Sequence, residues 1–539
     1  MSPVRPGRDA LRAAGGLCLV DFAGPEPSAR VERLIAEHHI AGVVLFRKNV
    51  VSAAQVAELT DAIQRLARAA GAPPLWVAVD HEGGAVNRFG LGAPGTLGAP
   101  PSAGALPVAA PGVTPLPSAM ALGAAGETHL ARAAGAVAGR ELRAMGIHLN
   151  FAPVMDVNSN PANPVIGARS FGESPDLVAR LGVAFIEGMQ AAGVGATAKH
   201  FPGHGDATVD SHLALPRVDH ARARLDAVEL PPFAAAVRAG VGAVMSAHIT
   251  FPSLDPDRVP ATLSWAILTG LLRERWGFDG IVCSDSLSMG AIADCGGPGA
   301  AAVAAVRAGC DLLLALGPDA VQDEVLESLA RAIETGGVSD ARLAQARARL
   351  GRAAARWRVG APRTDSLAGV VGAGEHAQVA RRIAEAAVTL VQDRAGVIPL
   401  SGGRIGVTAV SVGAGEHDPP DLAAALRGHH AAVRTLFAPQ APAEDSLPEI
   451  DYLVVVTCTR GGLSYDQVRV VRALHSRLGD RLVVVAAGDP YDLMQVPEVP
   501  AYLATYSPDA HSLDAAARVL LGLVPARGRL PVTLPRGLG

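Results

Sequence analysis

Residues 42–80 read GVVLFRKNVVSAAQVAELTDAIQRLARAAGAPPLWVAVD. The segment opens with a short Val- and Leu-rich run and closes with a second one, LWVAVD, and both have the length and composition of buried strands. Between them, residues 53–70 space their apolar side chains with a helical period. This order predicts a strand, a helix and a parallel strand, which is the repeating unit of α/β proteins.

The same alternation continues on both sides of this unit. Short apolar runs recur through the first 360 residues, separated by amphipathic segments such as 175–192. The candidate strands are 16–22, 42–46, 75–80, 148–157, 195–201, 243–249, 280–286 and 311–316. Eight βα units predict a TIM (β/α)8-type barrel.

The rest of the chain predicts a second unit. A helix expected over 340–357 ends the first region, and a stretch containing Gly and Pro follows it. From residue 376 the chain again alternates helical segments with short Val- and Leu-rich runs. We therefore expect a TIM-barrel domain over 1–360, a linker over 361–375 and a smaller α/β sandwich domain over 376–539.

The overall composition argues against several classes of protein. The 539 residues carry a formal net charge of −4 and no run of Lys or Arg, so a nucleic-acid partner is not expected. No apolar stretch approaches the ~20 residues of a membrane-spanning helix. The five cysteines are scattered without CxxC spacing, which indicates reduced thiols rather than disulfides or a zinc site. These features favour a cytoplasmic protein, and they leave its oligomeric state open.

Polar residues gather where the candidate strands of the barrel end. They are Asp80, Asp156, Lys199, His200, His248 and Asp285. The carboxyl ends of barrel strands surround one mouth, and enzymes of this fold build their active sites there. Any one of these residues could simply be solvated at the rim, but five strands that share the pattern predict a site.

The segment KHFPGHGDATVDSH, residues 199–212, contains three histidines. His200 and His204 are four apart, as zinc ligands on a helix can be. Pro202 and two glycines argue against a helix here, so we expect a strand end that continues as a loop, without a metal.

Two parts of the sequence could carry acid/base and nucleophilic chemistry. In Asp210-Ser211-His212, the carboxylate could orient the imidazole, and His212 could then protonate a leaving oxygen. The alternative is an ordinary surface turn. In CSDSLSM, residues 283–289, Asp285 could attack a carbon centre, although Ser-Asp-Ser is also typical of a helix N-cap.

These motifs resemble family 3 glycoside hydrolases, and specifically their β-N-acetylglucosaminidase branch. KHFPGHGD…DSH is similar to the signature loop of that branch, and SDSLSM is similar to its nucleophile motif. Further similar segments are VDHEGGAVNRF (79–89), PLPSAMALGA (115–124), NPVIGARSFG (163–172) and GRLPVTLP (528–535). The resemblance covers nearly the whole chain and is strongest over 16–360.

The resemblance implies a retaining exo-β-N-acetylglucosaminidase that forms a covalent glycosyl-enzyme and acts in peptidoglycan fragment recycling. Asp285 would be the nucleophile, His212 the acid/base and Asp210 its dyad partner. The implied sugar-binding residues are Asp80, Arg88, Arg169, Lys199 and His200. Glu82 is expected to support its turn. The implied partner is a carbohydrate, an N-acetylglucosaminide, and no cofactor or metal is implied.

Two departures from the family pattern qualify the function that the resemblance implies. Residues 90–113 look like an insertion, which we expect to form a long loop over the barrel mouth, and Ser286 stands where a second Asp is common. A phosphorylase stays open because an imidazole does not repel an incoming phosphate as a second carboxylate would. A family 3 β-glucosidase, a metal-dependent hydrolase and a non-catalytic carbohydrate-binding relative also stay open. The natural leaving group and the role of the second domain are undetermined at this point.

Overall fold

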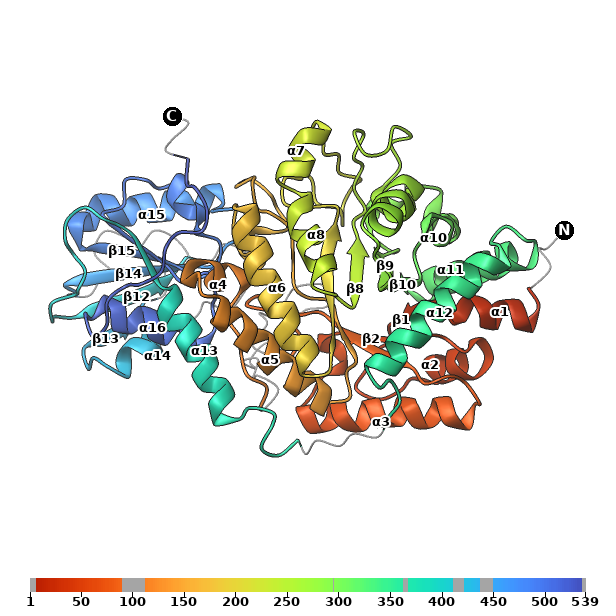
Figure 1. Cartoon of the computed structure of the whole chain (residues 1–539). Coiled ribbons are helices and arrows are strands. Elements are labelled where there is room, and N and C mark those ends of the chain that lie inside the picture. Colours follow the sequence, from red (N-terminus) through yellow and green to blue (C-terminus); the bar gives the residue numbers. More distant parts are fainter. Residues whose placement is uncertain are drawn as a thin grey trace.

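The computed structural model describes residues 6–89, 112–293, 295–361, 367–410, 421–436 and 449–535. Nearly all of the expected insertion, 90–113, therefore lies outside the described residues. Figure 1 shows two α/β units side by side, with the first coloured red to green and the second blue. None of the helices within the described ranges has the length and hydropathy needed to span a bilayer.

The first unit is a closed barrel of eight parallel strands. Their order around the barrel is β1-β10-β9-β8-β7-β6-β3-β2. The strands are β1 (Cys18–Val20), β2 (Gly42–Leu45), β3 (Trp76–Val79), β6 (Leu149–Asn150), β7 (Gly195–Phe201), β8 (Ala243–Ser246), β9 (Ile281–Ser286) and β10 (Leu312–Ala315). Each one falls within a predicted strand, so the predicted TIM-type barrel is confirmed.

Helices cover the outside of the barrel (Figure 1). They are α1 (Arg8–Gly15), α2 (Ala29–Arg33), α3 (Ala53–Ala69), α4 (Ala119–Ala125), α5 (Thr128–Ala144), α6 (Pro175–Ala191), α7 (Arg222–Ala227), α8 (Leu230–Arg238), η5 (Ala266–Arg275), α9 (Gly290–Ala293), α10 (Gly297–Ala308), α11 (Asp319–Glu334) and α12 (Asp340–Arg356). Helix α3 begins where Ser52 Oγ accepts a hydrogen bond from Gln55 N, at 3.1 Å. Its periodic apolar side chains, including Val56 and Ile63, are buried.

Strand β6 is much shorter than the predicted strand 148–157. The backbone remains close to β7 beyond its end, because Met155 N donates to Lys199 O at 2.7 Å. Pro153 has no N–H group to contribute to a regular ladder, which is a local reason for the break. The irregular path still delivers Asp156 to the carboxyl end of β7.

The second unit is a six-stranded sheet in the order β11-β16-β15-β14-β12-β13, parallel except for the β11–β16 pair. Its strands are β11 (Thr389–Asp393), β12 (Ile405–Ala409), β13 (Val433–Thr435), β14 (Tyr452–Thr457), β15 (Leu482–Ala486) and β16 (Ala501–Ala504). Its helices are α13 (Gly374–Ala387), α14 (Leu422–Arg427), α15 (Tyr465–Leu478) and α16 (Ala510–Leu520). Along β14, Val455 and Val456 belong to separate cores on opposite faces of the sheet, so the predicted second α/β unit is confirmed.

The second sheet turns the carboxyl ends of its strands toward the barrel. Tyr506, just after β16, accepts a hydrogen bond through its backbone O from Ser118 Oγ at 2.7 Å. Asp489, just after β15, accepts one from Ala168 N at 2.6 Å. The loops of the second sheet therefore lie against the barrel segment that runs from 116 to 172.

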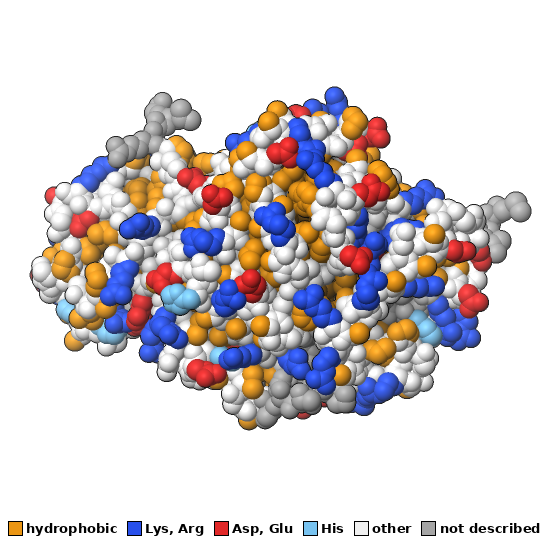
Figure 2. Space-filling view, viewed as in Figure 1, with side chains coloured by type: hydrophobic (Ala, Val, Ile, Leu, Met, Phe, Trp, Pro, Cys, Tyr) orange, Lys and Arg blue, Asp and Glu red, His pale blue; other side chains and the backbone are white. Residues whose placement is uncertain are grey.

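The surface of both units carries charges of both signs. On the face shown in Figure 2, Lys and Arg side chains are interspersed with Asp and Glu side chains. This mixture agrees with the formal net charge of −4. A face of this kind has no broad positive field that would attract a polyanion.

Candidate active site

Asp285 lies near the carboxyl end of β9, a strand that begins with three buried apolar residues. The next helix, α9, begins only at Gly290, so Asp285 does not cap it. Its Oδ1 accepts a hydrogen bond from Ser286 N at 2.7 Å. Burial alone would raise the pKa of Asp285, but the charges of His200 and His248 and the Ser286 N–H hold it below its usual value. The carboxylate is thus ionised, as a nucleophile requires.

His200 and the start of the following loop are held by the buried carboxylate of Asp156. His200 Nδ1 and Asp156 Oδ2 are 2.8 Å apart, and Asp156 Oδ1 accepts hydrogen bonds from His200 N at 3.2 Å and from His204 N at 2.7 Å. Burial would raise the pKa of Asp156, but these partners lower it. A single ionised side chain therefore fixes the point where β7 becomes a loop.

The loop after β7 places an imidazole beside a carboxylate, as predicted. His212 Nδ1 lies 2.7 Å from Asp210 Oδ1, which also accepts a hydrogen bond from His212 N at 2.8 Å. Because Asp210 can only accept while it is ionised, Nδ1 carries the hydrogen and Nε2 is left to face a ligand. The His212 side chain is 47% exposed, so a substrate can reach it.

The backbone of this loop is bonded to the segment that follows Asp285. Gly290 N donates to His212 O at 3.1 Å, and Ala291 N donates to Ser211 O at 3.2 Å. A Cβ on Gly290 would lie only 2.7 Å from His212 O, so the close approach depends on glycine. The charge of His212 also contributes to the lowered pKa of Asp285. The two candidate catalytic residues are therefore brought to the same part of the mouth.

His248 supports the Asp285 segment from the neighbouring strand end. Its Nδ1 is 2.9 Å from Thr262 Oγ1, and its Nε2 is 3.0 Å from Ser286 O. Burial lowers the pKa of His248. Because the Ser286 carbonyl can only accept, Nε2 is the donor of that hydrogen bond.

A cluster of ion pairs occupies the side of the mouth next to β3 and β7. Lys199 Nζ is 2.9 Å from Asp80 Oδ1 and 2.5 Å from Glu82 Oε1. Arg169 makes a two-pronged contact with Glu82, with Nε–Oε2 at 2.9 Å and Nη2–Oε1 at 2.8 Å. Arg88 Nη2 reaches Asp80 Oδ2 at 3.4 Å. These five side chains come from β7, the loop after β3 and the short helix η3 (Gly167–Arg169).

Glu82 is the centre of that cluster and was not among the predicted sugar-binding residues. Burial would raise its pKa, but the charges of Arg169 and Lys199 lower it strongly. Glu82 lies in a tight hairpin formed by β4 (His81–Gly83) and β5 (Val86–Asn87). The His-Glu-Gly-Gly sequence after a strand end was the available signal, but it did not show which cations the carboxylate would meet.

All the predicted site residues lie on the carboxyl side of the barrel strands. Those in direct contact with one another or with Glu82 or Asp156 are Asp80, Arg88, Arg169, Lys199, His200, Asp210 and His212. Asp285 joins them through the charges of His200 and His212. Asp156 was noted at a strand end but was missing from the predicted set. Within the described ranges, no three His, Cys, Asp or Glu side chains are arranged to hold a metal ion.

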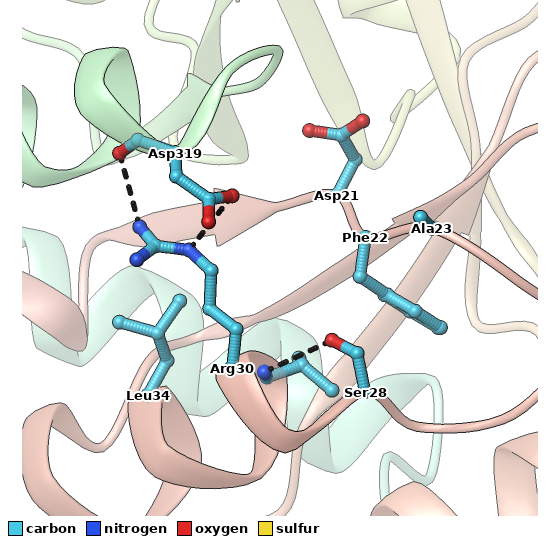
Figure 3. A pocket seen from close by; sticks show the side chains of 8 residues that line it. Asp21, Phe22, Ala23, Ser28, Arg30, Leu34 and Asp319 are labelled. Carbon is cyan, nitrogen blue, oxygen red and sulfur yellow. Dashed lines mark hydrogen bonds and ion pairs between the residues drawn. The ribbon is translucent and has the colours of Figure 1, made fainter.

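A separate hollow lies outside this group, beyond the carboxyl end of β1. Figure 3 shows Arg30 extending across it to Asp319, with Asp21 and Phe22 on its other side. Arg30 is paired there, with Nε 3.1 Å from Asp319 Oδ1. The hollow contains none of the predicted site residues, and its cation already has a partner.

Comparison with known families matches almost the whole chain. The model described as "Glycosyl hydrolase family 3 N terminal domain" matches residues 12–106 and 101–353. The model described as "Glycosyl hydrolase family 3 C-terminal domain" matches residues 388–539.

Similar individual proteins include two named as β-hexosaminidases. "Beta-hexosaminidase A" of Pseudoalteromonas piscicida is 36% identical over 394 residues, which cover 69% of this chain and 62% of that protein. "Beta-hexosaminidase" of Idiomarina loihiensis is 38% identical over 313 residues, which cover 58% of this chain and 86% of that protein. The chain thus spans less than two thirds of the Pseudoalteromonas relative.

Among solved structures, a glycoside hydrolase family 3 β-N-acetylglucosaminidase from Paenibacillus sp. str. FPU-7 is similar over its full length. Its TM-score is 0.87 at 37% sequence identity, and the match covers 98% of this chain and 99% of that one. Both the barrel and the second sheet are therefore shared with that structure.

Proposed function

This chain belongs to glycosyl hydrolase family 3, and on that basis we propose that it is a retaining exo-β-N-acetylglucosaminidase. Its similarity to proteins named as β-hexosaminidases and to the Paenibacillus enzyme supports the substrate class. The observation that carries the mechanism is the loop of His212 and Asp210, hydrogen-bonded through Gly290 to the segment after Asp285.

In the first step, Asp285 attacks the anomeric carbon of the terminal sugar. The bond to the leaving oxygen breaks, and His212 gives that oxygen the proton on Nε2. Asp210 accepts a hydrogen bond from Nδ1–H of His212, which fixes the orientation of the ring and stabilises its protonated form. The product of this step is a sugar joined covalently to Asp285.

In the second step, the roles of the imidazole reverse. His212, now neutral at Nε2, takes a proton from water as the water oxygen bonds to the anomeric carbon and the bond to Asp285 breaks. Two displacements at the same carbon retain its configuration. The exposed side of His212 gives the water a path to the site.

The ion-pair cluster would bind the hydroxyl groups of the same sugar. Lys199 and Arg169 offer N–H donors, and Asp80 offers carboxylate acceptors, all held in place by Glu82 and by one another. Charged groups held rigidly before the sugar arrives position it at little entropic cost. We assign His200 and Arg88 to the same sugar-binding group.

The biological setting and the domain limits are further parts of this proposal. Release of N-acetylglucosamine from the non-reducing end fits peptidoglycan fragment recycling in the cytoplasm. The division into 1–360, 361–375 and 376–539 is supported by the two family models, of which one ends at residue 353 and the other begins at residue 388.

The test is to compare turnover of 4-nitrophenyl N-acetyl-β-glucosaminide with that of the matching β-glucoside, with and without phosphate, and to follow the product by NMR. We expect a strong preference for the N-acetyl sugar and a first-formed β-anomer. A sugar 1-phosphate would identify a phosphorylase instead. A preference for the glucoside would refute the substrate class, and no turnover of either sugar would leave only a binding role.

A further inference from the structure

The second domain places one of its loops at the barrel mouth. The loop lies between β14 and α15, and its residue Gly461 donates through N to Asp489 Oδ2 at 2.9 Å. The other oxygen of the same carboxylate accepts from Ala168 N at 2.6 Å. Ala168 is the neighbour of Arg169 in the ion-pair cluster. A single carboxylate thus joins the loop of the second domain to the helix that carries a proposed sugar-binding residue.

The loop also lies against the segment that supports the candidate acid/base. A Cβ built on Gly461 would lie 3.9 Å from Pro164 Cα, so the two backbones run close together. The preceding residue, Asn163, donates through Nδ2 to His204 O at 2.8 Å. His204 in turn is 3.0 Å from the Ser211 hydroxyl, next to His212. The β14 loop therefore lies beside a segment that is hydrogen-bonded to the loop of His212.

Arg460 is the cation at this junction. Its side chain is exposed, and it forms no ion pair or hydrogen bond with any described residue. Its charge nevertheless interacts with that of Asp489 in its own domain and with those of Arg169, Glu82 and Asp210 at the barrel mouth. Desolvation by the surrounding protein, followed by repulsion from Arg169, lowers the pKa of Arg460. Access to water together with partial desolvation by protein is expected of a side chain that lines a cleft.

The topology of the second sheet gives an independent reason to expect a ligand here. Strand β12 lies between β13 and β14. The chain passes from β12 to β13 on one side and then crosses back to β14 on the other, so the strand order reverses between β12 and β14 and a topological switch point forms there. Open parallel α/β sheets bind ligands outside the carboxyl ends of the strands at such a point. The β14 loop and Arg460 lie at that edge, and the edge faces the barrel.

We propose that Arg460 binds an oxyanion on the leaving-group side of the cleft. The inference rests on the proposed function, because the terminal sugar would occupy the ion-pair cluster and the leaving group would extend past His212 toward the second domain. Arg460 and Arg169 repel each other, and among the described residues Asp489 attracts Arg460 without forming an ion pair with it, so an additional anion near both arginines would relieve the remaining repulsion. A guanidinium matches carboxylate and phosphate oxygens with paired N–H donors.

Two sources could supply the oxyanion. One is a carboxylate on the leaving sugar itself. The other is inorganic phosphate, which would enter after the leaving group has departed. In that case a phosphate oxygen would bond to the anomeric carbon as the bond to Asp285 breaks, and a sugar 1-phosphate would form.

The experiment compares 4-carboxyphenyl and 4-carbamoylphenyl N-acetyl-β-glucosaminides, which differ in the charge of the leaving group, with and without inorganic phosphate. In the wild type we expect either the carboxylate substrate or added phosphate to raise kcat/KM. In Arg460→Ala that gain should fall by about tenfold, the effect of losing one charge-assisted contact. If Arg460→Ala loses the increase in kcat/KM that the carboxylate substrate gives, the leaving group is the source of the oxyanion. If it loses the increase that added phosphate gives, phosphate is the source.

Arg469→Ala is the matched control, because it removes the same charge from an exposed position on α15 of the same domain. It should keep the wild-type pattern. Turnover of the neutral carbamoyl substrate tests the proposed function separately, and calorimetric titration with the same two glycosides compares binding without requiring turnover. The proposal is overturned if the wild type shows neither gain, or if Arg460→Ala retains it. Equal losses with both leaving groups also overturn it, since they would indicate a purely structural role.

Discussion

At the scale of single side chains, Asp285 at the end of β9 and His212 in the loop after β7 have different surroundings. Asp285 must be anionic in a partly buried place, and neighbouring imidazoles and a backbone N–H keep its pKa low there. His212 must exchange protons with substrate and water, and it is correspondingly half exposed with one nitrogen held by Asp210. Each residue therefore has the surroundings that its proposed role requires.

We predict that His212→Ala will slow the release of poor leaving groups far more than that of good ones. A positioned general acid contributes typically 10²–10⁴-fold, and an aryl leaving group such as 4-nitrophenol needs no proton. The measurement is kcat/KM for an N-acetylglucosaminide disaccharide and for the 4-nitrophenyl glycoside. His429→Ala, which breaks a His–Asp pair at 2.8 Å in the second domain, is the control. Equal losses on both substrates would remove His212 as the acid.

Asp285→Asn should abolish turnover while sugar affinity is kept. The amide has nearly the same shape but cannot form the covalent intermediate. Isothermal titration with N-acetylglucosamine should give a dissociation constant similar to that of the wild type, and the 4-nitrophenyl glycoside should not be cleaved. Turnover close to that of the wild type would refute the nucleophile assignment.

At the scale of elements, the site depends on how two loops meet. The loop after β7 has no helix of its own to hold it, and its backbone is instead bonded to the first residues of α9. Gly290 permits this contact because its missing Cβ leaves room for His212 O and Leu213 O, each of which a Cβ would approach to 2.7 Å. The glycine therefore allows the backbone of the proposed acid/base to lie close to the segment that follows the proposed nucleophile.

Gly290→Ala should lower kcat/KM by about 10²-fold, because displacing a catalytic group by about 1 Å can cost that much. The loss should be larger for the disaccharide than for the 4-nitrophenyl glycoside, since the acid is the group that moves. Gly351→Ala is the matched control, because it lies in α12 with no atom within 4 Å of its added Cβ. An unchanged Gly290→Ala enzyme would show that the loop contact does not position His212.

At the scale of the whole molecule, the buried ion-pair cluster links the site to stability. Glu82 forms ion pairs with both Lys199 and Arg169, whose side chains are 3% and 14% exposed. Glu82→Gln would leave both cations with less compensation in a buried place. We expect the barrel to lose about 3–5 kcal/mol of unfolding free energy. All four tryptophans lie within residues 1–360, so their fluorescence in urea follows the barrel alone.

The same variant tests the pH dependence of the cluster. The folded pKa of Glu82 is lowered, so its stabilising contribution is complete above the unfolded value of about 4.3 and is lost as the pH falls toward the folded value. The wild type should therefore lose barrel stability more steeply below pH 4 than Glu82→Gln does. Glu449→Gln, which breaks an exposed pair with Arg404, should leave the urea midpoint unchanged. Parallel acid profiles for Glu82→Gln and the wild type would contradict this account.

Much of this architecture could be predicted from local sequence patterns. A strand buried on both faces must be apolar along its length, so the apolar runs at 42–46 and 482–488 predict buried strands directly. Strand 148–157 was predicted too long because its apolar composition does not show where the ladder breaks. Asp285 and Lys199 were found because parallel strands bring their carboxyl ends to one mouth.

The amino-acid order alone was sufficient for the barrel, the second sheet and the position of each candidate side chain along the chain, because burial and helical or strand period are local properties. It was not sufficient for the pairing of Glu82 with Lys199 and Arg169, or for the approach of Arg460 to the barrel mouth. Those contacts join residues from separate strands and separate domains, and their energies depend on distance and burial. Only the folded chain determines which charges meet and how far water is excluded from them.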